Sequence, residues 1–112
     1  MKKLGTLQIC GLPYDVFVGN WKDEVELKDN YGLCDSGNQV IWIREGHKPE
    51  QFKNTLIHEI LHALIIESGA RLTLGENAAE TEEALIQILT PHLIAGLDSL
   101  AAWKKPRAAR RR

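Results

Sequence analysis

His58, Glu59 and His62 form an HExxH pattern, a spacing of side chains that can bind a metal ion and activate water. The two histidines are four residues apart, so on a helix their imidazoles lie one turn apart on one face and can bind the same metal ion. Zinc favours neutral imidazole nitrogen, needs at least one more protein ligand and keeps a position for water. Glu59 would lie beside that water and act as its general base. The HExxH pattern therefore predicts a zinc-dependent hydrolytic site.

The surrounding sequence bears on whether this pattern is accidental. Two histidines on a helix can be ordinary core or surface residues, and five-residue patterns do arise by chance. Here the motif is embedded in LIHEILHALII. Burying a carboxylate and two imidazoles in such a segment is costly unless something such as a metal ion uses them. The apolar setting favours the metal interpretation.

A third zinc ligand should come from outside this helix, and the acids of the following segment are the candidates. They are Glu76, Glu80, Glu82 and Glu83. Glu82 is the first choice, because it precedes the apolar positions 85, 86 and 89 by three, four and seven residues and so faces inward. Glu83 is the second choice, and His92 and Asp98 remain as alternatives. The other acids are expected to be solvated helix-face charges.

The first half of the chain alternates short β-like runs with turn residues. The segments 7–10, 14–18 and 40–44 predict three short strands that pair antiparallel, and 24–28 is a weaker candidate for a fourth.

Two helices are expected after Pro49. Segment 49–68 carries apolar residues at spacings of three and four, with proline suited to its first turn and Gly69 to its end. It is apolar over so much of its circumference that it should run through the core. Segment 69–79 is expected to be a connection with a short extended piece near 72–74. A second helix starts near Ala79, packs through positions 85, 86, 89, 93 and 97, and is kinked or divided at Pro91.

Length, composition and charge bound the class of protein. The 112 residues suit one domain, expected over 1–103, and 44% hydrophobic with 26% charged residues is typical of a folded globular chain. Segment 104–112 holds six of the fourteen Lys and Arg residues, which leaves eight basic against fifteen acidic side chains before it. This basic tail is expected to be a solvated, disordered terminus, with nucleic-acid contact as the alternative. The acidic domain argues against a nucleic-acid partner.

The remaining features concern the compartment. Cys10 and Cys34 have no CxxC pattern around them, and the first residues do not resemble a secretory signal, so we expect a cytoplasmic protein with free, buried thiols. Uninterrupted apolar runs such as 63–66 are too short to span a bilayer, so no membrane role is expected.

Three segments carry a resemblance to a known group. They are QVIWIRE at 39–45, TLIHEILHAL at 55–64 and EEALIQIL at 82–89. Over residues 14–100 the chain resembles the small gluzincin-type metallopeptidases of phages and prophages, and it is similar to the wider ImmA/IrrE-like peptidase group. The resemblance implies a minimal zincin-like α+β fold, with a small antiparallel sheet packed on the HExxH helix and a second, Glu-bearing C-terminal helix. In such a fold, segment 40–44 would be the edge strand along the cleft, where an extended peptide could pair. It also implies that His58, His62 and Glu82 bind Zn2+ and that Glu59 is the catalytic acid/base.

These features lead to one main hypothesis and one alternative. The main hypothesis is a zinc metallopeptidase acting on a peptide or protein substrate, with Tyr31 or His92 stabilising the oxyanion and His47 in a loop. The alternative is a non-catalytic regulatory or binding module with a zincin fold. The complete motif favours the enzyme, because a purely structural zinc site has no need of Glu59.

Overall fold

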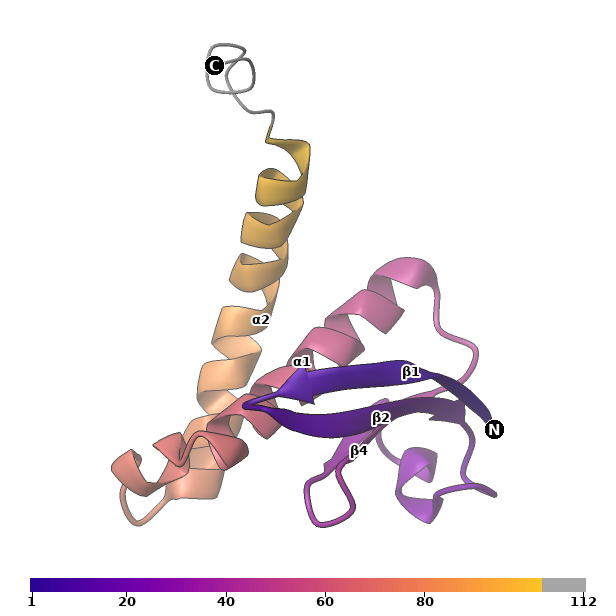
Figure 1. Ribbon diagram of the computed structural model, residues 1–112, viewed down its shortest axis with the longest axis horizontal. Helices are drawn as coiled ribbons and strands as arrows, with labels where there is room; N and C mark the ends of the chain where they lie inside the picture. Colours follow the sequence, from indigo (N-terminus) through magenta and orange to yellow (C-terminus); the bar gives the residue numbers. More distant parts are fainter. Residues whose placement is uncertain (104–112) are drawn as a thin grey trace.

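The computed structural model describes residues 1–103, which form a four-stranded sheet, a helix across one face of it and a second long helix (Figure 1). This confirms the α+β class. The elements are β1 (Lys2–Ile9), β2 (Leu12–Gly19), the 3₁₀ helix η1 (Val25–Lys28), β3 (Gly32–Asp35), β4 (Val40–Arg44), α1 (Pro49–Glu67), the 3₁₀ helix η2 (Ala70–Thr73) and α2 (Ala78–Ala102). The predicted basic tail, 104–112, lies outside the described residues.

The sheet is mixed, and its strand order is β1-β2-β4-β3. The pairs β1–β2 and β3–β4 are antiparallel, whereas β2 and β4 run parallel. The expectation of three antiparallel strands was therefore wrong. Strand β4 has the predicted bounds but lies inside the sheet, because the chain leaves β2, passes through η1 and returns as β3 on the outside. The edge strand on this side is β3, not β4.

Two short segments also differ from the prediction. Residues 25–28 form the helix η1 where a weak strand was expected, and Glu24 caps it by accepting a hydrogen bond from the amide of Glu26. Residues 70–73 form the helix η2 instead of an extended piece. It begins directly after Gly69, whose φ of 79° is the left-handed conformation that ends many helices.

The two cysteines lie in different environments. Cys10 and Gly11 form the tight turn between β1 and β2 with φ of 51° and 79°, the conformation that two-residue hairpin loops favour. Cys10 is consequently exposed, which corrects the expectation of a buried thiol, and Cys34 on β3 is half-buried.

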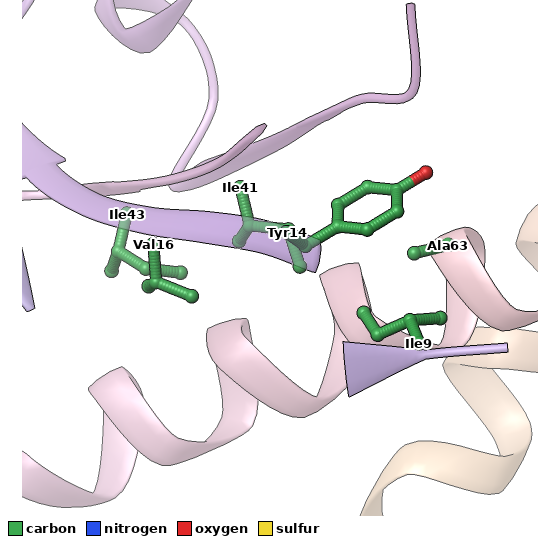
Figure 2. Close-up of a cluster of buried hydrophobic side chains, with 6 residues drawn as sticks. All are labelled: Ile9, Tyr14, Val16, Ile41, Ile43 and Ala63. Carbon is green, nitrogen blue, oxygen red and sulfur yellow. The ribbon is translucent and has the colours of Figure 1, made fainter. Parts of the chain in front are cut away.

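The hydrophobic core lies between the sheet and α1, as Figure 2 shows. It contains Ile9, Tyr14, Val16, Ile41, Ile43 and Ala63. The buried positions of α1 are Thr55, Glu59 and Ala63, which recur every four residues. Helix α1 therefore lies on the sheet with one face and does not run through the core as expected. The Tyr14 hydroxyl donates a hydrogen bond to Glu67 and ties β2 to the end of this helix.

Helix α2 is continuous through Pro91, and it buries few of its residues. Its buried positions are Glu82, Ile86 and Thr90. The leucines at 85, 89, 93 and 97, which were expected to pack inward, are 38–48% exposed. In Figure 1 the C-terminal half of α2 stands clear of the sheet. The first half of α2 therefore holds its buried contacts with the body, and in the second half Asp98 pairs with Lys53 of α1.

Candidate metal centre

Two histidines of α1 and one glutamate of α2 meet at the crossing of these helices. The rings of His58 and His62 lie 5.0 Å apart between centroids. The Glu83 carboxylate lies 3.0 Å from Nε2 of His58 and 2.7 Å from Nε2 of His62. One ligand atom from each of the three residues lies within 4.8 Å of the other two. Two imidazoles and one carboxylate thus converge on one point.

Glu82 occupies a different position, behind His62. Its side chain is only 1% exposed, and its Oε2 lies 2.5 Å from Nδ1 of His62, the nitrogen that faces away from Glu83. Arg71 of η2 donates from Nε and a terminal nitrogen to both Glu82 oxygens, at 2.8 and 3.0 Å. The inward orientation of Glu82 was predicted correctly. The sequence named Glu82 as the third ligand and Glu83 as the second choice; in the structure it is Glu83 that lies beside Nε2 of both histidines.

Electrostatics explain why Glu82 can be buried as a carboxylate. Burial opposes its charged form, but the hydrogen bonds from Arg71 and His62 outweigh burial and lower the pKa of Glu82. A carboxylate behind a metal-binding histidine fixes the ring orientation and the tautomer. With Nδ1–H donating to Glu82, the lone pair of neutral His62 is on Nε2, toward His58 and Glu83.

The donor set fits a zinc ion. Both ring nitrogens of His62 face carboxylate oxygens, an arrangement satisfied by an imidazolium or by a cation at Nε2. Burial lowers the pKa of His58, with His62 adding to the fall and Glu83 opposing it, which favours the neutral form that zinc binds. Ligands ~2 Å from one tetrahedral ion are separated by roughly 3.4 Å. The observed 2.7 and 3.0 Å separations need only small side-chain shifts to reach that value.

Glu59 lies under the cluster, between α1 and β3. It is 8% exposed, and burial raises its pKa to about 7, with Glu83 adding to the rise and His62 opposing it. Gly32 of β3 makes this arrangement possible. A Cβ at this position would lie 3.1 Å from Cγ of Glu59 and 2.6 Å from a methyl of Thr55. The edge strand can therefore approach the Glu59 side chain closely.

Two adjoining pockets open on either side of His58 and Glu59. The pocket toward η2 is lined by Asn30, Gly32, Leu33, Cys34, His62, Ile66, Arg71 and Glu83 together with these two residues. The pocket toward the middle of α2 is lined by Asn30, Tyr31, Gly32, Asn54, Thr55, Gln87, Thr90 and Pro91 with the same two residues. The cluster thus lies on a cleft between α1, α2 and the β3 edge.

Of the two candidates for oxyanion stabilisation, Tyr31 lines this cleft and His92 does not. Tyr31 lines the second pocket, and its ring lies 4.8 Å from the Arg44 guanidinium and 5.1 Å from the His47 ring. His92 is exposed and lines neither pocket. His47 lies in the loop before α1, as expected. Tyr31 is therefore the candidate that the geometry favours.

The remaining alternative ligand, Asp98, pairs with Lys53 away from the cluster. Arg71 and Gly32 were not singled out from the sequence, although both shape the site. An arginine in the connection between the two helices, eleven residues before Glu82, could have suggested an ion pair. Nothing in the local sequence indicated that β3 would pass beside Glu59.

Comparisons with protein-family models, with curated proteins and with solved structures find no match to this chain.

Proposed function

We propose that this protein is a zinc-dependent metallopeptidase of a minimal zincin-like fold, acting on a peptide or protein substrate in the cytoplasm. The observation that carries the proposal is the convergence of His58, His62 and Glu83 beside the buried Glu59. Glu83 replaces Glu82 as the proposed third ligand. Glu82, held by Arg71, orients the His62 ring.

In the proposed reaction, the zinc ligands and Glu59 have separate roles. His58, His62 and Glu83 would hold a zinc ion, which would lower the pKa of a water toward ~7 and polarise the peptide carbonyl. Glu59 takes the proton from the attacking water and passes it to the leaving amine. Burial raises the pKa of Glu59 to about 7 in the metal-free protein, and a cation held by the neighbouring histidines would favour the carboxylate form that accepts the proton.

The outer edge of β3 provides a means of holding an extended substrate. Gly32 and Cys34 of this strand line the same pocket as His58 and Glu59. Because β3 is the last strand of the sheet, its outer backbone groups have no partner strand among residues 1–103. A peptide adding to this edge would run past the proposed zinc site.

The test separates metal binding from hydrolysis. Zinc-loaded wild type and Glu59→Gln are incubated with a mixed peptide library, and cleavage is followed by mass spectrometry beside a zinc assay of each protein. Glu59→Gln should keep its zinc and lose ~100-fold or more of the cleavage rate. Glu50→Gln, at an exposed position of the first turn of α1, is the matched control and should cleave normally.

Two outcomes would contradict the proposal. Equal cleavage by Glu59→Gln and wild type would remove Glu59 from the reaction. Stoichiometric zinc in a wild-type protein that cleaves nothing in the library would favour the non-catalytic binding module.

A further inference from the structure

Helix α2 carries an exposed apolar face that the metal centre does not use. Its residues are Leu85, Ile88, Leu89, Leu93, Leu97 and Leu100, and Trp103 follows at the C-cap of the helix; each of the seven is 38–63% exposed. They recur at spacings of three and four, so they form one continuous face along the helix, here called the α2 stripe. Such a contiguous apolar face on a folded protein marks an interaction surface.

The α2 stripe is not explained by packing inside the protein. Among residues 1–103, α2 is the one helix long and apolar enough to cross a membrane, by length and composition. Core helices of soluble proteins also pass this test, but they are mostly buried, whereas only 11% of the apolar window of α2 is buried. The buried positions of α2 are Glu82, Ile86 and Thr90, and Leu93 and Leu97 continue this line, seven residues after Ile86 and Thr90, where their side chains are 38–40% exposed.

The charge beside the α2 stripe indicates what could cover it. Residues 104–112 follow directly after Trp103 and contain six Lys and Arg residues with no acid. The preceding part of the chain is acidic, with eight basic against fifteen acidic side chains. An apolar helix face ending in tryptophan and followed by a polybasic segment has the two properties that bind helices to anionic membrane surfaces.

We propose that the α2 stripe and the basic segment dock this protein on an anionic membrane surface. The helix lies in the plane of the interface and does not span the bilayer, because Glu82 and Glu83 in its first turns face the histidines of α1. Asp98, in its last turns, pairs with Lys53. The exposed leucines in the second half of α2 would enter the headgroup region.

A second copy of the chain is the competing occupant of the α2 stripe. Pairing two stripes would bury the apolar residues but would leave the basic segments without a partner, or bring them together when the helices run parallel. A membrane surface satisfies both features at once, and it repels the acidic body so that only α2 and the basic segment make contact.

The experiment measures flotation of the full-length protein with vesicles of phosphatidylcholine and phosphatidylglycerol (3:1), against vesicles of phosphatidylcholine alone. We expect binding to the anionic vesicles that weakens with added salt. Leu100→Glu, at a position 63% exposed, should weaken binding about tenfold or more, because it puts a charge in the interface. Leu72→Glu is the matched control, since Leu72 is 89% exposed on η2 outside the stripe, and it should bind as the wild type does.

A third variant tests the charge contribution while keeping the chain length. Replacing Arg107, Arg110, Arg111 and Arg112 with glutamine leaves Lys104 and Lys105, and it should weaken binding to the anionic vesicles by about tenfold or more and reduce the salt dependence. Circular dichroism verifies that each variant is folded.

Three results would overturn the proposal. The first is absence of binding to anionic vesicles. The second is equal binding by Leu100→Glu and wild type, which would reduce the contact to charge alone. The third is a dimer seen by light scattering that Leu100→Glu converts to a monomer without vesicle binding, which would assign the stripe to a second copy.

Discussion

Exchanging the two adjacent glutamates of α2 for glutamine, one at a time, should have very different effects on zinc affinity. Glu83 faces Nε2 of both histidines, so Glu83→Gln removes a proposed ligand. Of the histidine nitrogens, Glu82 contacts Nδ1 of His62, at 2.5 Å. Glu82→Gln therefore leaves the three proposed ligands in place and alters the basicity and orientation of the His62 ring. Losing such an outer carboxylate costs roughly 10–100-fold in metal affinity, or about 1.4–2.7 kcal/mol. Glu83→Gln should lose more than that.

The assay is a competition titration of zinc between each protein and a chromogenic chelator at pH 7.5. Glu80→Gln, at an exposed position on the same helix, is the control and should bind zinc as the wild type does. Thermal unfolding of the zinc-free proteins separates folding from binding. Glu82→Gln should lower the melting temperature, because it weakens the hydrogen bonds from Arg71 to a buried carboxylate, whereas Glu83→Gln should not.

A greater loss of zinc affinity in Glu82→Gln than in Glu83→Gln would contradict the proposed ligand set. If Glu82→Gln lost zinc and Glu83→Gln kept full affinity, Glu82 would be the ligand and the metal-bound side chains would be arranged differently. Equal and small losses in both would remove α2 from the metal site.

Three further predictions test the surroundings of the site. Gly32→Ala should destabilise the protein by ~1–3 kcal/mol in chemical denaturation, since the added methyl would lie 2.6 Å from a side-chain carbon of α1; unchanged stability would contradict the close approach of β3. Tyr14→Phe should cost about 1–2 kcal/mol through the lost hydrogen bond to Glu67, and an equal melting temperature would contradict that contact. Burial, and after it the negative charge of nearby Glu59, raises the pKa of the Cys34 thiol to about 12. Its thiolate fraction in the zinc-free protein at pH 8 is therefore about 10⁻⁴ and rises about tenfold per pH unit. Iodoacetamide at pH 8 should label the exposed Cys10 and spare Cys34, and equal labelling would contradict this environment.

Local sequence signals predicted the elements that local interactions determine. Strand 40–44 alternates half-buried and buried residues and was predicted with its exact bounds. Helix α1 begins at Pro49, whose fixed φ suits the first helical turn. The inward phase of Glu82 followed from its spacing to Ile86, which is fully buried.

The features that the sequence did not reveal depend on contacts between distant elements. Strand β3 is four residues long and has no alternating pattern, so neither its existence nor its position outside β4 could be predicted. The distinct roles of Glu82 and Glu83 depend on where η2 brings Arg71, eleven residues away. The apolar positions 85, 89, 93 and 97 were predicted to form a core face but are exposed. Periodicity indicates which residues share a face of a helix and not whether another element covers that face.

Anomalous diffraction at the zinc edge from crystals of the zinc-loaded protein tests the central claim most directly. We expect one strong peak bonded at ~2.0–2.2 Å to Nε2 of His58, Nε2 of His62 and a carboxylate oxygen of Glu83, with Glu59 adjacent but not bonded. A peak bonded to Glu82 in place of Glu83, or no peak near the two histidines, would contradict it.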